Sequence, residues 1–333
     1  MRKREMPRLI LHIGTHKTGT TSVQDQMSWV RASLARKDVV YPDLSPHTGH
    51  HGLLTDWIKL PRAYDLPEGG RHQLRELAET FRGTGQTIFL SSEEFSREGG
   101  PGGRVDFAEL RAIFSNYETT VLCVLREPIS FLQSVYLEIS RHKLPARPPE
   151  FLASALSTGQ ADGLWWDYGR LYQRLRQDFA ADEIRLINYE AAKAAPSGVI
   201  GRLLDEANIH VEEHLDLLPW SNLSPGILPR WAAQVVAGWT VPNDPLILAA
   251  QEAFDLEFGD LRQSLFTQEE RVQAAKVINR WTASFSASLA KDQKAFDLSR
   301  WQDSSTLMDR SHLTAEYWIR LARRLSFQLG QAA

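Results

Sequence analysis

The sequence predicts an α/β protein with a central parallel sheet, helices on both faces of that sheet and a mostly helical C-terminal part. Short apolar runs of strand length alternate with amphipathic segments of helix length from residue 8 to residue 188, the order typical of βαβ units. These runs are nearly continuously apolar, as expected for parallel strands buried on both faces. With 43% hydrophobic and 24% charged residues among 333, the composition suits a large buried core.

The individual elements follow from apolar spacing, proline and glycine. The predicted order is strand 8–13, glycine loop 14–21, helix 22–35, strand 39–41, histidine loop 47–51, helix 71–81, strand 87–90, glycine loop 99–103, helix 106–114, strand 119–125, helix 128–141 and strand 184–188. Pro128 in the first turn favours a helix start, because proline there loses no helical hydrogen bond. Right-handed crossovers between such strands produce one sheet covered on both faces.

We expect the whole chain, 1–333, to form one domain. Residues 8–195 would form the α/β core, and residues 196–333 a helical cap that determines the acceptor. Tryptophans such as Trp231, Trp281 and Trp318 recur through this cap, where packing between helices is their usual role.

Composition also restricts compartment and partners. A single cysteine, Cys123, excludes an intramolecular disulfide and fits a reducing compartment. The first apolar run, 9–13, is too short for the core of a signal peptide, and no run reaches the roughly 18–20 apolar residues of a membrane span. A net charge of −3 argues against general attraction to nucleic acid or anionic lipid. We therefore expect a cytoplasmic protein without stable membrane insertion and without a nucleic-acid partner.

The strongest motif is the loop over residues 14–21, Gly-Thr-His-Lys-Thr-Gly-Thr-Thr. Both glycines and the final threonine fit the pattern G-x-x-x-x-G-K-[ST] of phosphate-binding loops. The lysine does not, because position 20 is threonine and the only loop lysine is Lys17. Backbone N–H groups at a helix start and the hydroxyls of Thr20, Thr21 and Ser22 still predict an anion site.

This displaced lysine resembles the 5′-phosphosulfate loop of PAPS-dependent sulfotransferases (PAPS is 3′-phosphoadenosine-5′-phosphosulfate), and residues 12–24 are similar to a bacterial branch of that family. The resemblance implies a P-loop sulfotransferase-like fold and a nucleotide site that includes His16, Lys17, Thr18 and Gly19. It also implies that Lys17 contacts the oxygen that bridges phosphate and sulfate. It extends over residues 8–22 and 87–136.

A second part of the resemblance concerns the 3′-phosphate of the nucleotide. Arg126 follows the strand 119–125, and Ser134 stands eight residues later in the next helix, as in the family. Ligands bind at the carboxyl ends of such strands, where a planar guanidinium suits phosphate. The family often has a further basic residue where this chain has Phe131, which weakens the expected grip. Asn222 and Ser224 resemble a loop that closes near the nucleotide, and Tyr189-Glu190 resembles a recurrent pair whose role here is expected to be capping or packing.

Sulfo transfer needs positioning, charge stabilisation and a base for the acceptor, and the resemblance implies PAPS as co-substrate, PAP as product and no metal. Glu93, after the strand 87–90, is the preferred base, with Glu94 beside it. His51 in the histidine loop is the alternative, because its ordinary pKa suits a base. The chain shows no clear metal-ligand cluster with fixed spacing.

Three functions remain open at this point. The first is sulfo transfer from PAPS to a hydroxyl or amine of a small molecule or carbohydrate. The second is a P-loop kinase that uses ATP and Mg²⁺. The third is a PAP-binding module without catalysis.

Overall fold

The structure is a computed structural model that describes residues 6–44, 46–100, 102–209, 226–289, 293 and 307–332. It consists of two compact units, each made from several segments of the chain. Unit 1 comprises Met1–Glu127, Asp162–Trp220 and Trp281–Leu298. Unit 2 comprises Pro128–Ala161, Ser221–Arg280 and Ser299–Ala333. The predicted division of a single domain near residue 195 stays a prediction.

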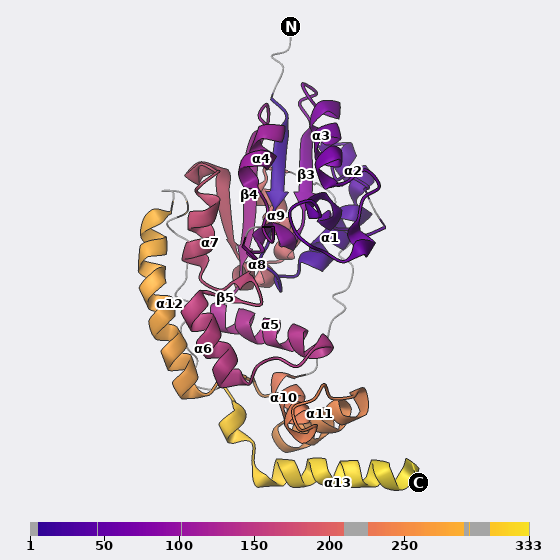
Figure 1. Cartoon of the computed structure of the whole chain (residues 1–333), viewed down its shortest axis with the longest axis vertical. Helices are drawn as coiled ribbons and strands as arrows, with labels where there is room; N and C mark the ends of the chain where they lie inside the picture. Colours follow the sequence, from indigo (N-terminus) through magenta and orange to yellow (C-terminus); the bar gives the residue numbers. More distant parts are fainter. Residues whose placement is uncertain are drawn as a thin grey trace. The chain divides into compact units, whose positions relative to one another are not determined.

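The described part of unit 1 contains a parallel sheet of five strands in the order β2-β3-β1-β4-β7 (Figure 1). Its strands are β1 (Arg8–His12), β2 (Val39–Val40), β3 (Thr87–Ser91), β4 (Glu118–Leu125) and β7 (Ile184–Asn188). β1 is central, and its Leu11 pairs with Leu90 of β3 and Val121 of β4. Because all pairs are parallel, the carboxyl ends of β1, β3 and β4 meet at one edge.

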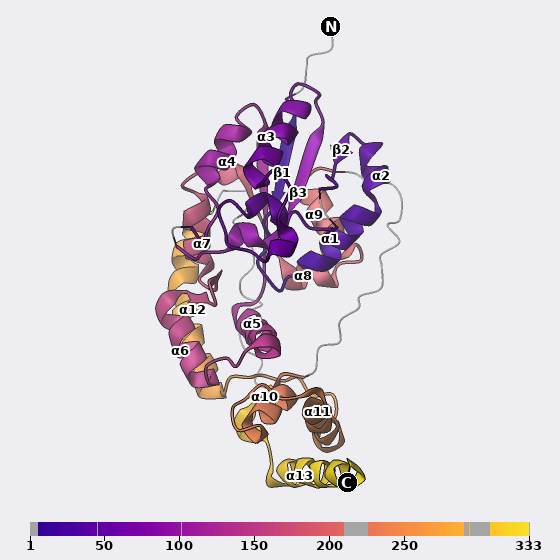
Figure 2. The same cartoon turned by 45° about the vertical axis from the view of Figure 1, so that its right-hand side comes forward.

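Helices cover both faces of this sheet. On one face, Ile10, Phe89 and Leu122 join a core with Val23 and Met27 of helix α1 and with residues of α2, α8 and α9. Figure 2 shows α3, α4 and α7 on the opposite side of the sheet from α1 and α9. Every residue of β3 is buried, as expected for a strand enclosed on both faces. The predicted α/β class with a parallel sheet is therefore confirmed.

Among the helices of unit 1, those predicted over 71–81 and 106–114 begin and end within one residue of the prediction, and the helices after residue 165 had no predicted bounds. The helix bounds in unit 1 are α1 Thr20–Trp29, α2 Arg31–Ala35, α3 Gly70–Thr80, α4 Phe107–Ile113, α7 Tyr168–Leu175, α8 Tyr189–Ala194 and α9 Gly198–Glu206. The single helix predicted over 22–35 is wrong: it starts at Thr20 and is interrupted at Val30, whose backbone leaves the helical region. The short helices η1 (His51–Leu54), η2 (Arg62–Tyr64), η3 (Glu93–Ser96) and η4 (Ala181–Glu183) were not predicted.

Unit 2 is mostly helical, as predicted for much of the C-terminal part. Its helices are α5 Pro128–His142, α6 Pro148–Thr158, α10 Ile227–Val236, α11 Asp244–Phe258 and α13 Ala315–Ala332, with η7 at Arg310–His312; α12, Gln268–Ser288, contributes to both units. Two short strands were not predicted: β5 (Gln160–Ala161) in unit 2 and β6 (Leu164–Trp165) in unit 1. Among the helices that the structure describes, none has the length and apolarity required to cross a bilayer.

Candidate functional site

The candidate site lies in unit 1, where β1, β3 and β4 end. The loop over residues 14–19 follows β1, the pair Glu93 and Glu94 follows β3, and Arg126 follows β4. Hydrogen bonds from the backbone N–H and side-chain hydroxyl of Thr15 to the carbonyl of Val124, both 3.0 Å, hold the loop against β4. The fold therefore collects at one edge three groups that are far apart in sequence.

The loop backbone is shaped to bind an anion. Lys17 and Gly19 both adopt left-handed conformations, with φ of 66° and 78°. For lysine this conformation costs about 1–2 kcal/mol, a strain found mostly at functional sites. Helix α1 begins directly after Gly19 with no side-chain cap and no acidic residue in its first turn. Its first N–H groups and the positive end of its dipole therefore remain available to a negative ligand.

Polar side chains surround the first glycine of the loop. A Cβ on Gly14 would lie 3.1 Å from Nε2 of His12, 3.3 Å from Oγ1 of Thr20 and 3.4 Å from Oγ1 of Thr18. The Thr18 hydroxyl donates to the carbonyl of Thr15 at 2.5 Å, so its proton is used within the loop. The buried Thr20 hydroxyl has no hydrogen-bond partner among the described residues. A side chain at position 14 would therefore have to displace these polar groups by a few tenths of an ångström. Thr20 is left with a donor for a ligand.

His12 lies beneath this loop, and its ring contacts the hydroxyl of Ser91 through Nδ1 at 2.8 Å. Burial lowers the pKa of His12 to about 4, although the charge of Glu93 opposes the shift. His12 is therefore neutral near pH 7 and adds no positive charge to the site. The cation of the loop is Lys17.

Arg126 is tied to the loop lysine through the backbone. Its Nη1 donates to the carbonyl of Lys17 at 2.9 Å, and its guanidinium lies over the ring of Tyr189, 5.4 Å from the centroid. The buried Nε of Arg126 has no hydrogen-bond partner within the described ranges. Glu190 accepts a hydrogen bond from the backbone N–H of Glu127 at 3.0 Å, just after Arg126. Arg126 thus stabilises the loop and retains a donor that no described residue satisfies.

The predicted bases Glu93 and His51 lie next to each other. Nε2 of His51 is 4.0 Å from Oε2 of Glu93, and Nδ1 of His51 is 2.7 Å from the Ser92 hydroxyl. Oε2 of Glu93 also accepts a hydrogen bond from Nε2 of Gln24 at 2.9 Å. The side chains of His51 and Glu93 keep 11% and 18% of their surface exposed, so both still reach solvent at the site.

Glu94 has a different environment although it is adjacent in sequence. Both of its oxygens accept from Arg97, and Nε2 of His16 lies 3.7 Å from Oε2. Burial raises the pKa of Glu94, but His16 and Arg97 outweigh that effect and lower the pKa to about 2. Glu94 is therefore ionised near neutral pH and binds Arg97. The 3.7 Å between Glu94 Oε2 and His16 Nε2 is too long for a hydrogen bond, and the buried His16 Nε2 has no hydrogen-bond partner in the described chain.

The remaining predicted site residues fall in three places. Thr21 is exposed and Ser22 is half-buried, both in the first turn of α1. Ser134 is half-buried on α5, which belongs to unit 2. Asn222 and Ser224 lie outside the described residues.

Sequence reasoning missed Gln24, Ser92 and Tyr64. Gln24 is buried on α1, one turn after Thr20, and a polar residue on the inward face of that helix was the available signal. The ring of Tyr64 meets that of His51 edge-on at a centroid distance of 4.9 Å. Burial, together with the charges of Glu93 and Glu94, raises the pKa of Tyr64. No local pattern places Tyr64 there, because it comes from the separate helix η2.

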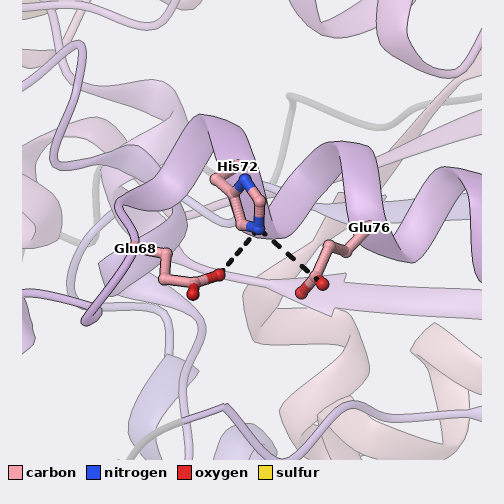
Figure 3. Close-up of side chains that lie close together, drawn as sticks. All are labelled: Glu68, His72 and Glu76. Atoms are coloured by element: carbon pink, nitrogen blue, oxygen red, sulfur yellow. Dashed lines mark ion pairs between the residues drawn. The ribbon is translucent and has the colours of Figure 1, made fainter.

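Two other polar features of unit 1 lie apart from this site. A cavity of about 480 Å³ includes Arg71 and Arg174 in its lining, but these arginines already bind Glu109 and Asp178. Glu68, just before α3, and His72 and Glu76 on α3 form an exposed trio, with Nε2 of His72 2.7 Å from Glu68 and 3.7 Å from Glu76 (Figure 3). Such solvated pairs are common on helices and contribute little. Neither feature contains a predicted site residue.

Comparison with known proteins gives similarity at the level of structure. No model of a protein family and no curated protein matches the sequence. The structure is similar to the crystal structure of a sulfotransferase from Alicyclobacillus acidocaldarius, with a TM-score of 0.49 and 15% identity over 88% of this chain and 98% of that one. It is also similar to the sulfotransferase domain of the olefin synthase of Synechococcus PCC 7002, with a TM-score of 0.35 and 15% identity over 84% and 96% of the two chains. Structurally, then, the chain is similar to bacterial sulfotransferases at low sequence identity.

Proposed function

We propose that this protein transfers a sulfo group from PAPS to a hydroxyl or amine of a small-molecule or carbohydrate acceptor. The observation that carries the proposal is the loop of residues 14–19, which has its lysine at position 17. Arg126 donates a hydrogen bond to the backbone carbonyl of Lys17, and Glu93 follows the neighbouring strand β3. Phosphate loops of ATPases place lysine at the position that Thr20 occupies here. A sulfo group carries less negative charge than a phosphoryl group, so one lysine and backbone donors suffice for it.

Several features of the site fit a nucleotide with two anionic groups, a 5′-phosphosulfate and a 3′-phosphate. Thr20 Oγ1, His16 Nε2 and Arg126 Nε are buried polar atoms without hydrogen-bond partners among the described residues. Each such atom costs about 1–3 kcal/mol unless a ligand or water binds it. All three are able to donate to phosphate oxygens, and they lie in or beside a loop that opens a helix. Thr20 and His16 would hold the 5′-phosphosulfate, and Arg126 would hold the 3′-phosphate.

PAPS supplies an activated sulfo group: the acceptor loses a proton, a bond forms from its oxygen or nitrogen to sulfur, and the bond from sulfur to the bridging oxygen breaks to leave PAP. Lys17 and the first N–H groups of α1 would stabilise negative charge that develops on that bridging oxygen. Glu93 would accept the proton from the acceptor. The close packing around Gly14 would keep the loop and the start of α1 in a fixed position relative to each other.

The contacts of the three candidate bases support Glu93 as the proposed base. Glu94 is engaged by Arg97 and His16, and its low pKa makes it a weak proton acceptor. Nδ1 of His51 is engaged by Ser92, and its Nε2 faces Glu93. Glu93 keeps one oxygen outside its bond to Gln24. We therefore assign Glu93 as the base and His51 as its neighbour.

Calorimetric titration with PAP, beside ATP with Mg²⁺, tests the proposal. We expect micromolar PAP binding that does not depend on Mg²⁺ and that weakens about 10- to 100-fold in Arg126→Ala, as loss of a charge-assisted contact implies. Arg36→Ala, which removes an exposed arginine of the same unit, is the matched control and should bind normally. If the protein binds ATP with Mg²⁺ tightly and does not bind PAP, the sulfotransferase proposal is wrong and the P-loop kinase is favoured.

Binding and catalysis need separate measurements. Transfer of label from [³⁵S]PAPS to β-naphthol, glucosamine and N-desulfated heparin reports catalysis. PAP binding without transfer to any acceptor or to water would identify a nucleotide-binding module instead.

A further inference from the structure

We propose that Gln24 is a positioning residue for the base, which fixes the Glu93 carboxylate so that a single oxygen faces the acceptor. The inference rests on the proposed function, and it concerns a residue that touches neither nucleotide nor acceptor in that mechanism. Gln24 acts through Glu93, to which it is joined across 69 positions of the chain.

The first step is the contact itself. Nε2 of Gln24 donates to Oε2 of Glu93 at 2.9 Å, and Gln24 is only 3% exposed. The carboxylate only accepts, so the amide nitrogen must be the atom that faces it. A hydrogen bond to a charged group in a site with little water is stronger than one at the surface. Gln24 therefore holds one particular oxygen of Glu93.

The second step is that the amide is itself immobilised. A Cβ on Gly49 would lie 2.5 Å from Oε1 of Gln24, so the backbone of the histidine loop packs directly against the amide. The Thr48 hydroxyl donates to Oδ1 of Asp25 at 2.6 Å and ties the same loop to α1. With neighbours on the helix and the loop, the Gln24 side chain has little freedom to rotate.

The third step is the effect on Glu93. Oε2 receives the Gln24 amide and is the oxygen nearest to Nε2 of His51, at 4.0 Å. In the described chain, no hydrogen bond of a side chain or backbone group is directed to Oε1. Oε1 is thus the oxygen left to take the proton of the acceptor.

The fourth step links the base to the phosphate loop. Gln24 is one helical turn after Thr20, on the helix whose N-terminus follows Gly19. The same rigid element therefore presents the anion donors and orients the base. The distance between the sulfo group and the proton acceptor would be set by α1.

The experiment compares Gln24→Met with Gln26→Met. Both residues are buried glutamines of α1, at 3% and 4% exposure, and Gln24 is the one that donates to Glu93. For Gln24→Met we expect kcat of PAPS-dependent transfer to fall about 10- to 100-fold, as a misplaced catalytic group implies. The KM for PAPS and the Kd for PAP should change less than about twofold, since ground-state binding is untouched. Gln26→Met should retain wild-type values.

A double-mutant cycle separates positioning from a general packing effect. In the Glu93→Gln background, Gln24→Met should cost nothing further, because its target is already lost. If Gln24→Met fails to fold, Gln24→Glu keeps the shape, removes the donor and sets a second carboxylate against Glu93. We expect it to lose more turnover than any neutral variant while it still binds PAP.

The possible outcomes are distinguishable. Wild-type turnover in folded Gln24→Met, or full additivity with Glu93→Gln, overturns this inference and leaves the proposed function intact. Absence of PAPS-dependent transfer by the wild-type chain overturns both.

Discussion

Glu93 and Glu94 are adjacent residues, yet their carboxylates have different partners. Arg97 and His16 hold Glu94 in its ionised form, with a pKa of about 2, against the effect of burial. Glu93 contacts a neutral amide and a histidine. The sequence preference for Glu93 over Glu94 and His51 stays a prediction, and the contacts now supply a physical reason for it.

Substitution of the two glutamates should separate their roles. We expect Glu93→Gln to lower kcat by about 100-fold or more, because general base catalysis contributes on that scale. Glu94→Gln should keep the kcat of the wild type, because Glu93 is still present. Its free energy of unfolding should fall instead, since Arg97 is left with a weaker partner. Steady-state transfer assays and denaturant unfolding of both variants measure the two effects. An equal loss of kcat in both would contradict this division of roles.

Lys17 combines the only loop cation with a strained backbone, and its replacement should affect chemistry more than binding. We expect Lys17→Ala to abolish measurable transfer while PAP binding falls by about tenfold or less, because the proposed role of Lys17 is to stabilise charge that develops on the bridging oxygen only as its bond to sulfur breaks. Lys37→Ala, an exposed lysine after α2, is the control for loss of one positive charge. Full turnover in Lys17→Ala would remove the mechanism proposed for the loop.

At the scale of elements, the contact between α3 and η1 depends on a glycine. A Cβ on Gly70, the first residue of α3, would overlap the backbone carbonyl of Leu53. We expect Gly70→Ala to lower the free energy of unfolding by about 1–3 kcal/mol, the usual cost of overpacking. His72→Ala on the same helix removes only the exposed pairs with Glu68 and Glu76 and should cost less than about 1 kcal/mol. Urea denaturation of the two variants measures both losses in the free energy of unfolding, and equal losses would contradict the prediction.

The elements also show which structural features the sequence patterns predict. β7 has the predicted bounds, and β3 and β4 differ from prediction by one residue each, because continuous apolar runs bounded by polar residues define buried strands. The break at Val30 was not predictable from spacing, since the apolar period continues through it. The edge that collects Lys17, Glu93 and Arg126 follows from parallel strands alone. The bonds from Gln24 to Glu93 and from Arg126 to Lys17 do not, because they join residues 69 and 109 positions apart through tertiary packing.

At the scale of the whole molecule, buried histidines make stability depend on pH. Burial lowers the pKa of His12 and of His50 to about 4, below the ordinary 6.5, against smaller opposing effects of Glu93 on His12 and of the Pro42 carbonyl on His50. Below pH 6.5 the unfolded chain binds protons that the folded chain does not, so stability falls as pH decreases from 6.5 towards 4. Each histidine contributes of order 1–3 kcal/mol to this loss.

Replacement of one histidine should reduce that dependence. His50 accepts from the N–H of Ser91 and donates to the carbonyl of Pro42, and His50→Gln keeps a polar group there without a titrating ring. We expect its unfolding midpoint to be lower at pH 7 and to fall less between pH 7 and pH 4.5 than that of the wild type. His142→Gln, on an exposed ring, should preserve the wild-type slope. Parallel slopes for all three proteins would contradict the assignment.

Unit 1 is assembled from segments that leave the ribosome at very different times. The sheet is complete once residue 188 has been made, but the rings of Tyr168 and Tyr172 pack against Trp281 and Phe285 of α12. At roughly 5–20 residues per second, about 5–20 s of synthesis separate β7 from this helix. During that interval the nascent chain presents the aromatic flank of α7 without its cover. Chaperone binding during translation is the expected consequence, and fragments that end soon after residue 209 should aggregate even though every strand of the sheet is present.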